Sequence, residues 1–182
     1  MTRSIPMVAL LAALAACASA PELDHYTIDM TPSGRVQAVT NLEVNGVVVS
    51  DKLAQRRIVI HLSPTRIETY ANARWASGVR QMVEQKLAAE LGAPAADGRR
   101  LVLDGAVTAF EQVDGSAGPQ ARVGLDMEIR DHGSNRSEPP LLEKTYEVLR
   151  PAATDSVDGV VQALSRCLEE IAAEIAEDAA GL

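Results

Sequence analysis

The clearest pattern in the chain is a strict alternation of apolar and polar residues near its middle. From Ala121 to Arg130 every second side chain is apolar or small, which predicts a strand with one buried face and one wet face. A turn-rich segment at 114–119 and a polar loop at 131–140 separate it from two further predicted strands, over 101–112 and 142–149. We therefore expect three strands in an antiparallel meander.

The region 57–91 combines the strand period with the helix period. The run 58–62 alternates and predicts a strand, Ser-Pro-Thr at 63–65 predicts a turn, and 66–70 predicts a second short strand. Asn72 offers a helix N-cap, because its side-chain oxygen can accept a hydrogen bond from a free backbone N–H. The apolar residues that follow recur at helical spacing until Gly92: Trp75, Val79, Met82, Val83, Leu87 and Leu91.

The flanking segments predict shorter elements. We expect a first strand at 25–28 and a second at 42–49, in which Asn45-Gly46 forms either a tight hairpin or a bulge. Pro151 ends the sheet, and Thr154 or Asp155 caps a last helix. The apolar stripe of this helix favours packing on the sheet, and the alternative is a helix that protrudes to meet a partner: Val157, Val160, Val161, Leu164, Cys167, Leu168, Ile171 and Ile175.

These elements predict an α/β fold in the general sense of mixed α and β. We expect a mixed, largely antiparallel sheet with two long amphipathic helices packed on it. The 166 residues that remain after residues 1–16 are removed suffice for one domain with a good core, over 25–182.

The N-terminus has the pattern of a secretory signal peptide. Arg3 precedes an apolar run at 5–16, which is too short to span a bilayer, since a span needs about 20 residues. Leu-Ala-Ala-Cys at 14–17 resembles the bacterial lipobox, in which the thiol accepts a diacylglyceryl group. Residues 1–16 are then a lipoprotein signal peptide and Cys17 is the lipid anchor. The alternative is ordinary cleavage after Ala20, which would discard Cys17.

Acylation at Cys17 would hold the protein on a membrane, because two or more acyl chains together bind stably. Residues 17–24 form a short tether, so the domain would hang within about 25 Å of its membrane, at roughly 3.3–3.6 Å per residue. Ala18 rather than Asp follows the cysteine, which by resemblance to the usual sorting rule favours the periplasmic face of the outer membrane over the inner membrane.

A series of short motifs runs through the strand and helix region: Arg57-Ile58-Val59, Ser63-Pro64, Arg66-Ile67 and Tyr70-Ala71-Asn72-Ala73-Arg74-Trp75-Ala76. This series, strongest over 42–91, resembles the ABC-type transport auxiliary lipoproteins. These are lipoprotein members of bacterial intermembrane lipid-transport systems whose partners carry MCE domains. The resemblance implies an auxiliary, non-enzymatic component of phospholipid transport that docks an MCE-domain protein.

Composition and missing motifs exclude several other classes. The net charge is −8 and the pI is near 4.9, which argues against nucleic-acid binding and against adsorption to anionic headgroups. Neither a phosphate-binding Gly-rich loop nor a zinc motif occurs, so we expect no nucleotide, cofactor or metal. With Cys17 acylated, Cys167 lacks an intrachain partner, and we expect it to be a small buried apolar side chain.

Two groups of residues remain as candidate sites. Tyr70, Arg74 and Trp75 either lock the corner between strand and helix or frame a surface for the MCE partner. His61 and Ser63 share one face of a strand, which gives weak support to a cofactor-free hydrolase, although the sequence identifies no orienting carboxylate. We expect no catalytic residue.

A lipoprotein that activates a peptidoglycan synthase is the alternative binding function, but such proteins tend to need a longer tether.

Overall fold

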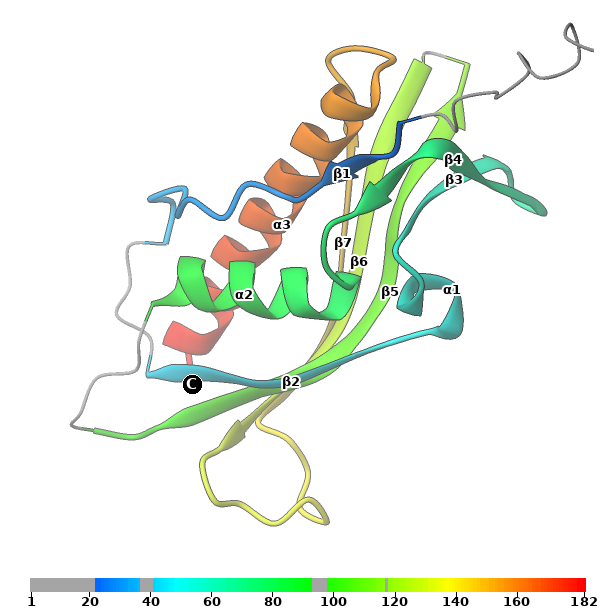
Figure 1. Cartoon of the computed structure of the whole chain (residues 1–182). Coiled ribbons are helices and arrows are strands. Elements are labelled where there is room, and N and C mark those ends of the chain that lie inside the picture. The colour runs from blue at the N-terminus through cyan, green and yellow to red at the C-terminus, as the bar shows by residue number, and fades with distance from the viewer. Residues whose placement is uncertain (1–21, 37–40, 93–97, 117) are drawn as a thin grey trace, which may run out of the picture.

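The computed structural model describes residues 22–36, 41–92, 98–116 and 118–182 of the 182-residue chain. These segments form one seven-stranded mixed sheet and three helices (Figure 1). The strands are β1 (Asp24–Tyr26), β2 (Leu42–Val49), β3 (Arg57–Ser63), β4 (Arg66–Trp75), β5 (Leu101–Gly115), β6 (Gly118–Asp131) and β7 (Leu142–Pro151). The helices are α1 (Asp51–Ala54), α2 (Val79–Leu91) and α3 (Val157–Ala180). The signal segment and Cys17 lie outside the described residues.

The long ribbon of β5 and β6 organises the sheet. The two strands pair antiparallel from Leu101↔Asp131 to Gly115↔Gly118, and β7 continues the meander on the far side of β6. This meander was predicted and is confirmed. It places every apolar residue of the alternating segment on one face, and Ala121, Val123 and Leu125 are fully buried.

The other edge of β5 is shared by two strands. Its first half pairs with β2 and the segment Glu111–Val113 pairs with β3, in both cases parallel, while α1 connects the two (Figure 1). The register between β2 and β5 shifts between Val44 and Gly46, so Asn45-Gly46 belongs to a bulge rather than a hairpin. The remaining strands follow in the order β3, β4 and β1.

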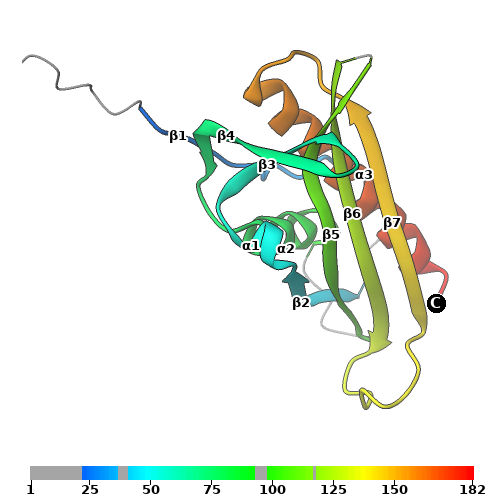
Figure 2. The same cartoon turned by 90° about the vertical axis from the view of Figure 1, so that its right-hand side faces the viewer.

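Both long helices cover the same face of the sheet. Figure 2 shows β5, β6 and β7 in front of α2 and α3, which leaves the opposite face of these strands open. α3 contacts β6 and β7, and α2 contacts β2 and α3. The buried side of α3 includes Val160, Leu164, Cys167, Leu168 and Ile171. The predicted mixed α/β class and the packing of the last helix on the sheet are therefore confirmed.

The start of α2 was predicted wrongly. Asn72 is not a helix cap: β4 continues through it to Trp75, and the helix begins only at Val79 with Gly78 at the N-cap. The reason is tertiary, because β1 pairs with the end of β4 from Asp24↔Ala73 to Tyr26↔Trp75. This pairing satisfies backbone groups that a helix would otherwise have bonded internally.

Two smaller boundaries also differ from the prediction. β1 ends at Tyr26 rather than reaching residue 28, and Ile28 instead packs in the core as part of the following loop. The N-cap of α3 is Ser156, whose hydroxyl accepts a hydrogen bond from the backbone N–H of Gly159 at 3.2 Å. Thr154 instead bonds the Ser156 hydroxyl at 2.8 Å, and so supports the cap from outside it.

Candidate functional site

Trp75 lies in the hydrophobic core rather than on the surface. Its side chain has no exposed area, and its ring centroid lies 5.5 Å from that of Phe110 in a tilted arrangement. The indole N–H has no hydrogen-bond partner among the described residues. This placement favours the packing role that the sequence offered for the residue, because the indole is not available to a partner in this conformation.

Tyr70 and Arg74 occupy the more accessible part of the same strand. The Tyr70 hydroxyl donates to the side-chain oxygen of Gln112, and burial followed by the nearby Asp114 carboxylate raises its pKa. Arg74 donates through Nη1 to the backbone carbonyl oxygens of Tyr70 and, at 2.7 Å, of Ala73. Both side chains are half-buried, and the Tyr70 side chain bonds Gln112 whereas the Arg74 side chain bonds backbone of its own strand. The three candidates therefore do not converge on one pocket.

A cluster of charged side chains surrounds Glu111 at the junction of β3 and β5. The Glu111 carboxylate has no exposed area, and it accepts hydrogen bonds from Lys52 at 2.8 Å and from Nε of Arg122 at 3.1 Å. Nε2 of His61 lies 3.1 Å from the same carboxylate. Burial alone would raise the pKa of Glu111, but the hydrogen bonds from Lys52 and Arg122 outweigh it and lower that pKa.

This cluster bears on the hydrolase alternative. The structure supplies a carboxylate beside His61 that sequence reasoning missed, because Glu111 comes from another strand. The Ser63 hydroxyl, however, accepts a hydrogen bond from the Thr65 backbone at 3.4 Å, within its own turn. Lys52 shares the Glu111 oxygen that His61 approaches. The arrangement neutralises a buried acid and does not align a nucleophile with a base.

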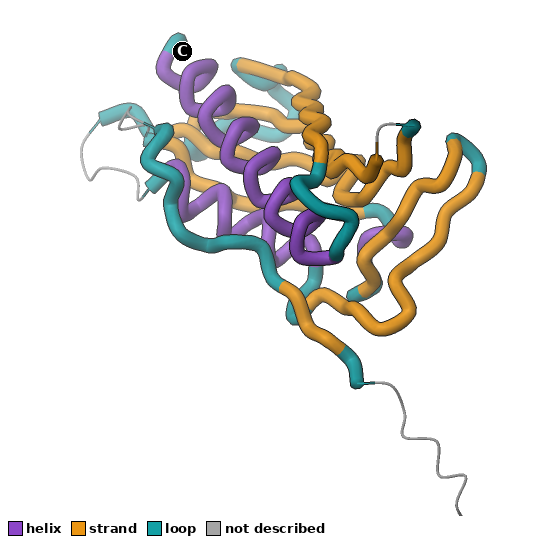
Figure 3. The backbone as a smooth tube through the Cα atoms, turned by 90° about the horizontal axis from the view of Figure 1, so that it is seen from above, coloured by secondary structure: helices purple, strands orange, loops and turns teal. Residues whose placement is uncertain are grey.

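A second buried ion pair fastens the N-terminal segment to α2. Residues 27–36, which we call the strap, run as a loop beside α2 and α3 (Figure 3). The Lys86 ammonium, itself without exposed area, donates to the Thr31 carbonyl at 2.6 Å and lies 2.8 Å from Glu90. Glu90 accepts from the backbone N–H and the hydroxyl of Ser33 at 2.8 Å and 2.6 Å. Sequence reasoning missed this pair, because both residues look like ordinary charges on a helix.

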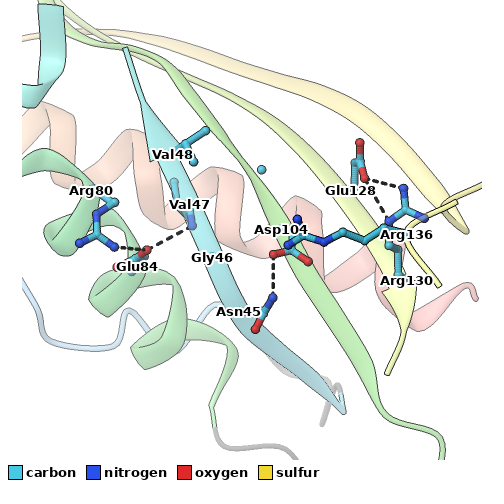
Figure 4. A pocket seen from close by; sticks show the side chains of 11 residues that line it. Asn45, Gly46, Val47, Val48, Arg80, Glu84, Asp104, Glu128, Arg130 and Arg136 are labelled. Atoms are coloured by element: carbon cyan, nitrogen blue, oxygen red, sulfur yellow. Dashed lines mark hydrogen bonds and ion pairs between the residues drawn. The ribbon is translucent and has the colours of Figure 1, made fainter. Parts of the chain in front are cut away.

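A polar hollow of about 620 Å³ is lined by residues of β2, α2, β5 and β6 and is drawn in Figure 4. Four of its charged side chains form ion pairs, Arg80 with Glu84 at 3.3 Å and Arg130 with Glu128 at 2.8 Å. Glu84 also accepts from the Val47 backbone N–H at 3.1 Å. Asn45 donates to Asp104 across the β2–β5 pairing at 2.8 Å. Pockets for small organic ligands are mostly apolar. The hollow is instead lined by ion-paired groups, which makes it a poor match to an acyl chain.

Within the described segments no three His, Cys, Asp or Glu side chains are grouped so that they could hold a metal ion. None of the helices found there combines the length and the apolar character that crossing a bilayer requires. The fold and its charge clusters thus define a class: a one-domain α/β protein whose helices cover one sheet face and whose buried charges are paired internally.

The family follows from comparison of the sequence. The model of the family described as ABC-type transport auxiliary lipoprotein component matches residues 26–176, so the chain belongs to that family. The resemblance inferred from the motifs at 57–76 is therefore confirmed. No curated protein matches this sequence.

Two crystal structures share the fold. An uncharacterized protein superposes with a TM-score of 0.66 at 20% identity, covering 86% of this chain and 98% of its own. Protein XCC0632 from Xanthomonas campestris superposes with a TM-score of 0.62 at 20% identity, covering 84% of this chain and 91% of its own. At this level of identity the likeness concerns the fold alone.

Proposed function

We propose that this protein is a lipid-anchored, non-enzymatic component of an ABC-type intermembrane lipid-transport system. It docks an MCE-domain partner at the periplasmic face of the outer membrane. The observation that carries the proposal is the family match, which spans residues 26–176 and begins nine residues after Cys17. The protein then works by holding its partner in place, and the partner and the transporter supply the lipid path and the ATPase.

The internal pairing of the buried charges supports an adaptor role. Glu111, Lys86 and Glu90 are satisfied by neighbouring side chains and by the strap, so they stiffen the domain. A rigid domain on a short tether is suited to positioning a partner close to a membrane. The half-buried side chains of Tyr70 and Arg74 on β4 remain the best candidates for contact with the partner. Trp75 would then support the strand from within the core.

Co-purification from the native envelope tests the proposal. The tagged full-length protein is extracted in detergent, and bound proteins and lipids are identified by mass spectrometry. We expect an MCE-domain protein and subunits of an ABC transporter to be recovered. The substitutions Tyr70→Phe and Arg74→Gln should weaken that recovery without unfolding the domain. Recovery of a peptidoglycan synthase in place of an MCE protein would reject the proposal.

The anchor has its own test. Mass spectrometry of the mature N-terminus should find acylated Cys17, and membrane fractionation should place the protein with the outer membrane. The substitution Ala18→Asp should move it to the inner membrane while leaving acylation intact. An N-terminus beyond residue 17, or one without fatty acid, would remove the tethering argument.

A further inference from the structure

One segment of this acidic protein carries a net positive charge. Between Asp51 and Trp75 the sequence has five basic residues and two acidic residues, a net charge of +3 in a chain whose net charge is −8. The structure folds this segment into α1 and the β3–β4 hairpin, which projects from the body of the sheet on the side where β1 begins (Figure 1). The positively charged segment therefore also occupies one region of the folded domain.

Two of these cations are free. Arg56 and Arg57 are exposed, and neither forms an ion pair within the described residues, whereas Lys52 is paired with Glu111 and Arg66 with Glu68. Arg57 lies at the rim of a hollow of about 390 Å³, and we call the residues that line this hollow the hairpin face: Lys52, Gln55, Arg57, Val59, Ile67, Glu68 and Thr69.

The hairpin face also presents an apolar side chain to solvent. Ile67 is 52% exposed beside the hairpin turn. Free arginines together with an exposed aliphatic residue are the combination by which peripheral proteins contact a membrane surface, because the cations approach headgroup phosphates while the apolar side chain enters the interface.

The length of the tether brings this face to the membrane that holds Cys17. β1 runs parallel to β4 with Asp24 opposite Ala73. Cys17 precedes Asp24 by seven residues, and Arg66 at the hairpin turn precedes Ala73 by seven residues. Seven residues span at most about 25 Å. The distance from the start of β1 to the acylated Cys17 is therefore at most about the distance from the start of β1 to the hairpin turn. A membrane that holds Cys17 is then within reach of the hairpin.

We propose that the hairpin face, together with the neighbouring Arg56, is a second membrane contact, which binds the anionic phospholipid headgroups of the membrane in which the Cys17 lipid is embedded. Arg56 and Arg57 attract the phosphates and Ile67 inserts at the interface. The negative net charge of the chain argues against adsorption of the domain as a whole, and the hairpin face is the local exception. The same membrane surface repels the rest of the domain, so the contact fixes the orientation of the domain. The proposal rests on the proposed anchoring at Cys17 and adds an orientation to it.

Site-directed fluorescence quenching tests the contact on the acylated full-length mature protein. A fluorophore is attached at Gln55→Cys on the hairpin face or at His132→Cys in the loop between β6 and β7. Cys167 is buried and does not compete for the label. The protein is reconstituted into phosphatidylcholine vesicles with or without phosphatidylglycerol, both containing a quencher attached to the lipid. We expect strong quenching at residue 55 only with phosphatidylglycerol, and weak quenching at residue 132 in both.

A matched pair of variants isolates the charge. Arg56→Gln with Arg57→Gln should weaken the contact about fivefold for each arginine, and raising the salt concentration should have a similar effect. Arg99→Gln with Arg100→Gln removes the same charge from another Arg-Arg pair, at the end of β5 remote from β3, and should leave the quenching unchanged.

The outcomes separate this inference from the proposed function. Absence of acylation by mass spectrometry would reject the anchor and the proposed function. Two results with an acylated protein would reject the hairpin contact alone. One is equal quenching at residues 55 and 132, and the other is quenching at residue 55 that is unchanged by Arg56→Gln with Arg57→Gln. Protection of the residue 55 label only after an acidic partner protein is added would also overturn it, in favour of a protein ligand.

Discussion

The ammonium of Lys86 lies 2.8 Å from the carboxylate of Glu90 one helical turn along α2, and neither side chain has more than 1% of its surface exposed. Burying two charges is costly, and the pair is retained because the strap completes its hydrogen bonds. The pair therefore connects the segment that follows β1 to the helical layer.

Removal of one partner should destabilise the domain strongly. Lys86→Met keeps the apolar length of the side chain but leaves the Glu90 carboxylate buried without its counter-ion. We expect the free energy of unfolding to fall by about 3–5 kcal/mol, measured by urea denaturation. The control is Arg80→Met, which breaks the exposed Arg80–Glu84 pair of the same helix and should cost at most about 1 kcal/mol. Equal losses in the two variants would contradict the buried pairing.

Stability should fall in acid because of Glu90 and Glu111. Burial alone would raise the pKa of each carboxyl, but hydrogen bonds from Lys86 and Ser33 to Glu90, and from Lys52 and Arg122 to Glu111, lower it in the folded state. A lowered folded-state pKa contributes stability that is complete above the unfolded-state value of about 4.3 and is lost as the pH falls through the folded-state value.

We therefore expect the free energy of unfolding to decrease steadily below about pH 4.3, measured by urea denaturation between pH 7 and pH 3. Glu111→Gln removes one of the carboxyl groups whose pKa is lowered, so the variant should be less stable at pH 7 and should show a shallower decrease in acid. An unchanged slope in that variant would show that Glu111 does not contribute.

Gly105 should not tolerate a side chain. A β-carbon at this position would lie 2.2 Å from the backbone carbonyl oxygen of Asp126 on the neighbouring strand, which cannot move without displacing β6. We expect Gly105→Ala to lower the free energy of unfolding by about 1–3 kcal/mol. Gly46→Ala on β2 is the control, since its β-carbon would come only to 3.4 Å from the Asp104 side chain. Thermal denaturation of the two variants makes the comparison.

Trp75→Ala should lower the stability of the domain rather than act only on partner binding. The substitution removes a fully buried ring and its contact with Phe110, so a loss of about 3–5 kcal/mol is expected. Tyr70→Phe removes one hydrogen bond to Gln112 and should cost only about 0.5–1.5 kcal/mol. A Trp75→Ala protein with an unchanged melting temperature and lost partner binding would instead place the indole in an interface.

Cys167 should be unreactive in the folded protein. Its thiol has no exposed area, and burial raises its pKa to about 12, so almost no thiolate exists at neutral pH. We expect no reaction with a maleimide in native buffer and one labelled thiol per acylated chain after denaturation. Fast native labelling would indicate local opening of α3.

Much of the fold could be predicted from the chain, because it depends on local periodicity. The alternation from Ala121 to Arg130 specifies a one-sided strand, and the stripe around Leu164 and Ile171 specifies a helix that packs on it. The turn residues at 114–119 indicate where β5 and β6 connect, although the strands continue into this segment, with Asp114 paired to Pro119 and Gly115 to Gly118. Such patterns record which side of each element is buried, and burial is the dominant favourable term in folding.

What the sequence alone determined about this protein is its class: a mixed α/β domain of an auxiliary lipoprotein family, indicated by local patterns and by the motif at 70–76. Only the tertiary structure decided that Trp75 ends a strand instead of opening a helix, since β1 comes from nearly fifty residues away to pair with it. It also decided that Glu111 and Lys86 are buried and paired. Those features depend on contacts between distant segments, and no local period encodes which distant backbone or charge will be the neighbour.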